Sequence, residues 1–227
     1  MKKEKHFCIA RNRAALYGML SSVYIQIPER RTLELNFVDP ASKLLEAIPK
    51  EAKEISKPIA EGIRIVRDYI RDRGLHLEEC LLDLLKDWTR LFRGVDRSGP
   101  LPPYESVYRT ERIQTKYAQE VHRLFSKMGI RVPEEWHQPL DYIGVELDFM
   151  RLLCEKELRH RNDSQLKALR EALDEERAFL EDHLGPWVPI FCKRVLGEAG
   201  EDYYRGIAHL TLGLVAFDRL WVPRLLS

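Results

Sequence analysis

The sequence has no hydrophobic run long enough to cross a membrane and no marked excess of either charge. Its most apolar stretch, 206–217, is interrupted by His209 and falls well short of the roughly 20 residues of a transmembrane helix. The 37 Lys and Arg residues nearly cancel the 36 Asp and Glu residues, giving a formal charge of +1. A dedicated nucleic-acid binder needs a basic surplus to neutralise phosphates. The sequence therefore favours neither a membrane protein nor a nucleic-acid-binding protein.

Cysteine is scarce, and no two cysteines lie close together along the chain. Cys8, Cys80, Cys154 and Cys192 are widely spaced, whereas metal sites and redox-active dithiols generally need two thiols a few residues apart. We expect buried or half-buried free thiols in a reducing compartment. Charged residues recur through positions 2–13, so the N-terminal segment lacks the apolar core of a secretory signal peptide. We therefore expect a cytoplasmic protein.

The patterns of common catalytic and cofactor sites are missing too. The sequence contains no Walker motif, no G-x-G-x-x-G, no G-x-S-x-G and no H-E-x-x-H. Di-iron bundles carry Glu-x-x-His on each of two helices, and Glu157 with His160 supplies that motif on one expected helix. We interpret this pair as a solvated helix face. The sequence predicts no catalytic residue, no cofactor, no metal site and no enzymatic activity.

Apolar residues at helical spacing are present in nearly every segment. Leu16, Leu20, Val23 and Ile27 recur at three- and four-residue steps until Pro28 ends the pattern. Further helices are expected within 41–74 (broken at Pro49 and Pro58), 81–92, 143–154, 165–184 and 203–221. The sequence thus predicts an all-α protein, a single compact multi-helix domain over 1–227 with on the order of eight to ten helices.

The clearest interruption is the segment 93–104, RGVDRSGPLPPY. Its two glycines and three prolines cannot continue a helix, because proline lacks the amide donor and clashes with the preceding turn. We interpret the segment as a hinge loop inside the domain. Such a hinge permits helix exchange between protomers, so the sequence is compatible with a monomer or a domain-swapped dimer.

Three segments stand apart from ordinary helix-bundle sequence. The first, 87–108, ends a helix with an aromatic-x-x-Leu-Phe pattern and continues through the proline loop into YESVY. The second, 138–157, begins with QPLDY, and the third is FLEDHLGPWVPIF at 179–191. In order and spacing they resemble the TorD/DmsD/NarJ-like family of chaperones that mature molybdenum enzymes. The resemblance covers about residues 17–221, although Gln138 and Tyr142 replace the Glu and His usual in that family.

The resemblance implies a non-catalytic cytoplasmic chaperone. It would bind the twin-arginine signal peptide, or the apo form, of a molybdopterin oxidoreductase subunit during cofactor insertion and before export. Asp141 could accept the planar guanidinium of an arginine, and large apolar side chains could line a groove for the peptide. The predicted client-binding residues are Trp88, Leu91, Phe92, Tyr104, Glu105, Tyr108, Pro139, Asp141, Tyr142 and Glu146.

Other interpretations of these residues stay open. By spacing alone, Leu91 and Phe92 belong to a core, Asp141 is a helix-capping acid, and Glu105 and Glu146 are solvated or ion-paired. Two other functions also remain: a helical nucleotide-binding or hydrolysing enzyme using Asp141 and Glu146, and a self-associating scaffold. A metal-dependent activity in purified protein would favour the enzyme. A peptide-dependent gain in stability would separate the chaperone from the scaffold.

Overall fold

A computed structural model describes residues 2–33, 38–73, 76–93, 102–112, 115–133, 136–163 and 165–227. These residues are mostly helical and contain no β-strand, so the predicted all-α class is confirmed. The α-helices are α1 (Lys2–Ile25), α2 (Val38–Ala47), α3 (Lys57–Arg73), α4 (Leu77–Arg93), α5 (Glu105–Thr110), α6 (Thr115–Lys127), α7 (Ile143–Asn162), α8 (Leu166–Phe179), α9 (Gly185–Glu198) and α10 (Asp202–Leu226). Shorter helical turns are η1 (Arg30–Leu33), η3 (Lys50–Ala52) and the π-helical η5 (Leu180–Leu184).

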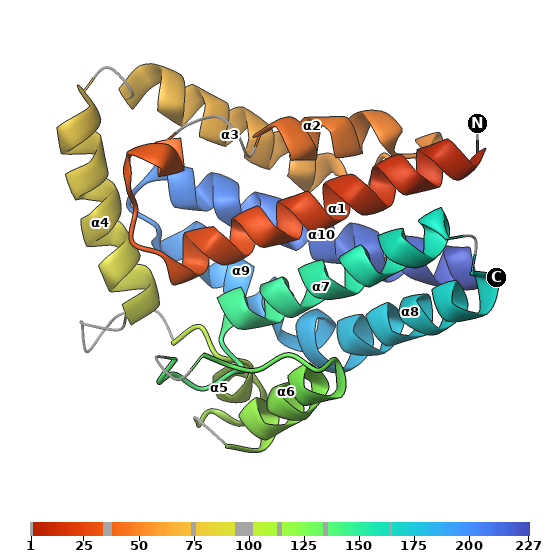
Figure 1. Ribbon diagram of the computed structural model, residues 1–227. Helices are drawn as coiled ribbons and strands as arrows, with labels where there is room; N and C mark the ends of the chain where they lie inside the picture. The colour runs from red at the N-terminus through yellow and green to blue at the C-terminus, as the bar shows by residue number, and fades with distance from the viewer. Residues whose placement is uncertain are drawn as a thin grey trace.

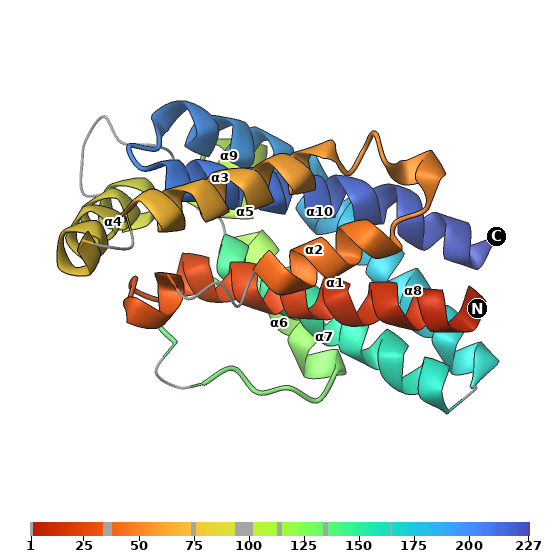
Figure 2. The ribbon, with the colours of Figure 1, turned by 90° about the horizontal axis from the view of Figure 1, so that it is seen from above.

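The long helices form two packed layers around one hydrophobic core. α1 packs against α7 and α2, while α10 packs against α3 and α9, and Figure 2 shows α3, α9 and α10 in one layer and α1 and α7 in the other. The first and last helices begin and end on the same side of the bundle (Figure 1). The helix α4 lies at the opposite end, and the short α5 and α6 lie beneath α7 and α9 in that view. The described part of the chain is thus an irregular multi-helix bundle.

Small residues let α3 and α10 approach each other closely. A Cβ atom added at Gly62 of α3 would lie 2.7 Å from the carbonyl oxygen of Gly206, and one added at Gly213 would lie 2.8 Å from the amide nitrogen of Ile59. No real side chain fits at such distances without backbone movement. Glycine at these positions therefore fixes how deeply α10 sits in the bundle.

A buried ionic cluster joins α1 to α7, α8 and α10. The fully buried Arg13 donates from Nε to Asp218 Oδ1 over 2.7 Å, from Nη1 to Glu157 Oε2 over 2.7 Å, and from Nη2 to Glu176 Oε2. Burying ions is costly unless each has close partners, and here a single guanidinium serves three helices. We call Arg13, Glu157, Glu176 and Asp218 the arginine cluster. It corrects the interpretation of Glu157 as part of a solvated face.

The structure also corrects details of the expected helices. The helix α1 ends at Ile25, and the exposed Ile27 lies beyond it rather than on its apolar face. Pro58 does not break a helix but occupies the first turn of α3, where its missing amide donor costs little. Most of the predicted hinge at 93–104 lies outside the described residues. The cysteines are free, three buried and Cys8 half-buried, as expected.

Candidate functional site

Two of the family-like segments meet in space. The amide of Glu105 donates to the carbonyl of Asp141 over 2.8 Å, and the amide of Ile143 donates to the carbonyl of Pro103 over 2.9 Å. These bonds join residues 102–108 to 138–146, and we call the paired segments the junction. The sequence motifs are thus parts of one structural unit, formed where the chain enters α5 and α7.

Asp141 lies at the centre of the junction, fully buried. Its Oδ2 accepts a hydrogen bond from the backbone amide of Ser106 over 3.0 Å, so it caps the first turn of α5 rather than its own helix α7. Its Oδ1 has no hydrogen-bond partner among the described residues. Burial raises the pKa of the Asp141 carboxyl above its ordinary value, although the Ser106 bond opposes the shift.

Tyr142, which stands where the resembling family usually has His, attaches the junction to α1. Its hydroxyl donates to the carbonyl of Tyr24, and its buried ring meets the ring of Tyr104 edge-on at 5.5 Å. Tyr104 is half-buried, and its hydroxyl donates to Gln138 Oε1 over 3.1 Å. Both departures from the family pattern, Gln138 and Tyr142, therefore make contacts inside the junction.

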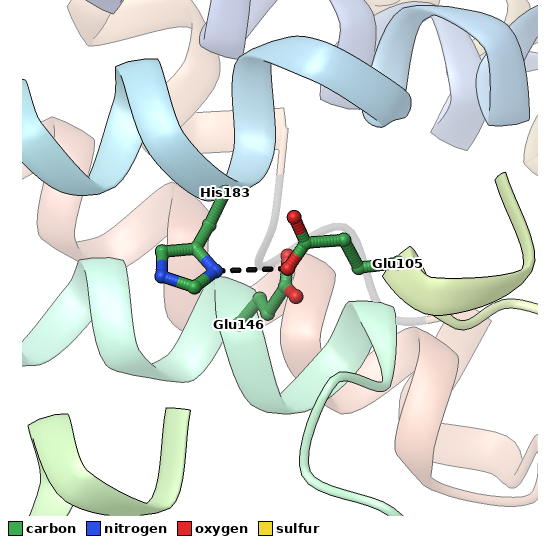
Figure 3. Close-up of side chains that lie close together, drawn as sticks. All are labelled: Glu105, Glu146 and His183. Carbon is green, nitrogen blue, oxygen red and sulfur yellow. Dashed lines mark hydrogen bonds and ion pairs between the residues drawn. The ribbon is translucent and has the colours of Figure 1, made fainter. Parts of the chain in front are cut away.

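Beneath the junction lies a second buried polar group, formed by Glu105, Glu146 and His183 (Figure 3). The Oε2 atom of Glu105 lies 2.8 Å from Nδ1 of His183, while its Oε1 accepts from Arg109 over 3.0 Å. The Oε2 atom of Glu146 accepts from the indole of Trp187 over 2.9 Å. Burial, and then the charge of Glu105, raises the pKa of Glu146 well above its ordinary value. We call Glu105, Glu146 and His183 the carboxylate–histidine cluster.

The predicted residues of α4 do not line an open groove. Trp88, Leu91 and Phe92 are at most 3% exposed, and the Trp88 indole donates to the carbonyl of Val23 over 3.1 Å. Phe92 meets the ring of Tyr24 at 5.2 Å. For these three side chains the structure favours the core interpretation that their spacing allowed.

The solvent-accessible part of the junction is aromatic and partly polar. Its half-buried members are Pro102, Tyr104, Tyr108, Gln138 and Pro139, and beside them lies the half-buried Trp136, whose ring is 6.2 Å from that of Tyr142. The Tyr108 ring packs at 5.4 Å from Trp187 and at 6.0 Å from Phe191, so this surface continues into the core through α9. We call these half-buried residues the junction surface.

Sequence reasoning missed three residues that complete the site: Trp136, His183 and Trp187. His183 and Trp187 lie in the third family-like segment, but nothing in their spacing shows that they face Glu105 and Glu146, 78 and 41 residues away. The available sequence signal was the run HLGPW at 183–187, in which a histidine and a tryptophan flank a Gly-Pro pair. His183 lies in the π-helical turn η5 and Trp187 in the first turn of α9, and both side chains are buried.

The all-helical bundle agrees with the fold expected for the family that the sequence resembles. The profile of the family described as "Nitrate reductase delta subunit" matches residues 52–193. Since this match spans more than half of the chain, the protein belongs to that family. Among the described residues, no helix is both long enough and apolar enough to span a membrane.

Curated relatives named "Chaperone protein TorD" match most of the chain. The relative from Vibrio parahaemolyticus is 27% identical over 210 residues, covering 92% of each chain. The relative from Photobacterium profundum is 31% identical over 169 residues, covering 74% of this chain and 73% of its own. The relative from Vibrio cholerae is 25% identical over 216 residues, covering 95% and 94%. These relatives are named as chaperones rather than as enzymes.

Proposed function

We propose that the protein is a non-catalytic cytoplasmic chaperone that binds the twin-arginine signal peptide of a molybdopterin oxidoreductase subunit. It would hold the peptide, or the apo-enzyme that carries it, during cofactor insertion and before export. Membership of the family and the chaperone names of the relatives support this proposal. The observation that carries it is the junction itself, because the family-like segments form one surface only once the chain has folded.

The junction surface suits the apolar part of a signal peptide. Tyr104, Tyr108 and Trp136 are half-buried aromatic side chains, and aromatic rings combine a large apolar face with a polar edge. Pro139 and Pro102 restrict the backbone on either side, which lowers the ordering cost of binding. An extended or helical apolar peptide segment could lie across this surface.

The arginine pair of the peptide would need an acidic partner, and Asp141 is our candidate. Its Oδ1 accepts no hydrogen bond from the described residues, and a guanidinium is the donor that carboxylates bind best. Because Asp141 is fully buried, we propose that the client displaces the first turn of α5. That turn is held to Asp141 by the Ser106 amide and the Glu105 amide.

The alternative enzyme would need Asp141 and Glu146 to face a substrate. Both carboxyls are fully buried, and Glu146 is bound to the Trp187 indole. No contact of the described residues favours hydrolysis over peptide binding, so the chaperone is the function we put forward.

Calorimetric titration with a twin-arginine signal peptide from a molybdoenzyme of the same genome tests this proposal. We expect micromolar-range binding, roughly −8 kcal/mol. A peptide with both arginines changed to lysine should bind more weakly, because lysine cannot make the bidentate contact. Asp141→Asn should show the same loss for the arginine peptide, since asparagine can still cap Ser106 but carries no charge.

A matched control is Asp174→Asn on α8, where the side chain of the aspartate is 46% exposed and pairs with Arg177 in the same helix. This variant should bind the peptide like the wild type. Absence of binding to any such peptide would contradict the signal-peptide proposal. Binding that is equally strong in Asp141→Asn would keep the chaperone and remove Asp141 from the site.

A further inference from the structure

We infer that the carboxylate–histidine cluster is a binding site for a divalent first-row transition-metal ion such as Zn²⁺. The inference stands on the geometry of Glu105, Glu146 and His183 and is independent of the signal-peptide proposal. The sequence predicted no metal site, because motifs for metal sites place ligands close together in sequence. Here the ligands come from α5, α7 and η5, three separate parts of the chain.

The three side chains already lie at ligand-like spacing. Each offers one ligand atom, and these atoms lie within 4.8 Å of one another. In Figure 3, the carboxyl groups of Glu105 and Glu146 point toward each other, with the His183 imidazole beside them. An ion bound at about 2.0–2.2 Å from each ligand atom therefore needs only small side-chain shifts. Among the described residues, no other group of three such side chains meets this spacing.

One ligand atom in the cluster lacks a partner. The Glu146 side chain is fully buried, its Oε2 accepts from Trp187, and its Oε1 accepts no hydrogen bond from any described residue. A buried carboxylate oxygen without a donor costs free energy. A cation beside Oε1 would supply the missing partner, while the Trp187 indole fixes the orientation of the carboxyl as outer-shell donors do in metal sites.

The local charge favours a cation as well. Glu105, Glu146 and Asp141 lie close enough for the charges of Glu105 and Asp141 to act on Glu146, and one guanidinium, that of Arg109, is bonded to this group. Arg109 bonds Glu105 through Oε1, so an ion at Oε2 would replace the hydrogen bond of Oε2 with His183 Nδ1 and leave the Arg109 bond in place. The side chain of Arg109 is 32% exposed, so it compensates the buried charge from the edge.

The ligand types select the class of ion. Imidazole nitrogen suits Zn, Cu, Fe and Ni, whereas Mg and Ca prefer sites made only of oxygen. Two carboxylates and one imidazole match the three-ligand sites that leave a fourth position for water or another ligand. A bound ion would also tie α5 to α7 and η5, the elements beneath the junction surface.

The test uses the full chain without an affinity tag, stripped of metal with a chelator and titrated with Co²⁺ and Zn²⁺. We expect one equivalent of Co²⁺ to give the visible absorption of a low-symmetry site, and Zn²⁺ to displace it and to raise the melting temperature. Glu146→Gln should keep the bond to Trp187 but weaken ion binding by about tenfold or more. His183→Asn should have the same effect.

The matched control is Glu176→Gln, which changes a fully buried carboxyl of the arginine cluster and should leave ion binding unchanged. Circular dichroism of each metal-free variant separates loss of the ligand from loss of the fold. If a variant fails to fold, the stoichiometry and Co²⁺ spectrum of the wild type still show whether the protein binds an ion at a defined site. No stoichiometric binding, or binding that Glu146→Gln and His183→Asn leave unchanged, would overturn the inference and leave the cluster as a proton-sharing carboxyl pair.

Discussion

The bundle contains two buried polar clusters that compensate the charge of their buried carboxyls differently. In the arginine cluster, Arg13 bonds directly to Glu157, Glu176 and Asp218. In the carboxylate–histidine cluster, Glu105 and Glu146 lie beside the imidazole of His183. The guanidinium bonded to Glu105 is that of Arg109, whose side chain is partly exposed.

Two further donors bind the carboxyls of the arginine cluster. The Tyr17 hydroxyl donates to Asp218 over 2.9 Å, and Arg161 Nε donates to Glu157 over 2.6 Å. Two guanidiniums therefore face three carboxyls, and burial raises the pKa of Glu176 well above its ordinary value despite the opposing charge of Arg13. A protonated Glu176 leaves the charges balanced. Among the described residues, Glu176 Oε1 and Glu146 Oε1 both lack a hydrogen-bond partner. The comparison teaches a difference in charge instead: each carboxyl of the arginine cluster is bonded to a guanidinium, whereas Glu146 is bonded to the neutral indole of Trp187.

The largest expected effect is the removal of the central guanidinium. Arg13→Met should destabilise the protein by about 3–5 kcal/mol, because it leaves buried carboxylates without their partner. Urea unfolding monitored by circular dichroism gives the value. The control Arg64→Met removes a mostly exposed arginine paired with Glu61 and Asp68 and should cost at most about 1 kcal/mol. Equal effects of the two substitutions would remove the structural role of the arginine cluster.

A steric substitution gives a reference value for the changes in unfolding free energy that the charge substitutions cause. Gly62→Ala should cost about 1–3 kcal/mol, because the new Cβ would meet the carbonyl oxygen of Gly206 at 2.7 Å. Gly197→Ala, in α9, has nothing within 4 Å of its added Cβ and should stabilise by about 0.4–1 kcal/mol. Thermal and urea unfolding of both variants test this. A neutral Gly62→Ala would contradict the close approach of α3 and α10.

The dependence on pH separates a neutral Glu176 from a charged one. Its pKa is raised in the folded state, so its favourable contribution is complete below the unfolded value near 4.5 and is lost as pH rises toward the folded value. Relative to Glu176→Gln, the wild type should lose about 1.4 kcal/mol per pH unit between the two values. Unfolding free energies of both proteins from pH 4 to 8 measure this difference. A constant difference would show that folding does not shift the pKa of Glu176.

The smallest expected effect on stability falls on the other cluster. Glu146→Gln in metal-free protein should stay within about 1 kcal/mol of the wild type, because the amide oxygen still accepts from Trp187 and no buried charge is left unpaired. The measurement is urea unfolding at neutral pH, beside Arg13→Met. A loss of unfolding free energy as large as that of Arg13→Met would make Glu146 a structural residue and would contradict the proposed difference between the two clusters.

The sequence predicted the helical class and most helix positions because apolar spacing is a local signal. It placed the residues of α7 correctly from Ile143, Leu147, Met150 and Cys154, which are all buried. The order of the family-like segments indicated the family, which the profile match confirmed.

Contacts between distant segments could not be predicted in this way. Arg13 reads as one more basic residue of a charged helix, and only the packing of α1 against α7, α8 and α10 shows its three partners. The same holds for His183, which lies in a π-helical turn and contacts Glu105, 78 residues away in the sequence. The predicted client-binding residues remain predictions, since the fold shows where they lie and not what they bind.

Hydrogen exchange of the protein with and without a twin-arginine signal peptide tests the central claim most directly, because it locates the client site without a substitution. When the peptide is bound, we predict faster exchange at the Glu105 and Ser106 amides, whose bonds to Asp141 are released, and slower exchange of the other amides within 102–112 and 136–146. We predict little change in α3 and α10. Protection confined to helices away from the junction, or no protection at peptide concentrations that saturate binding, would contradict the proposal that clients are recognised there.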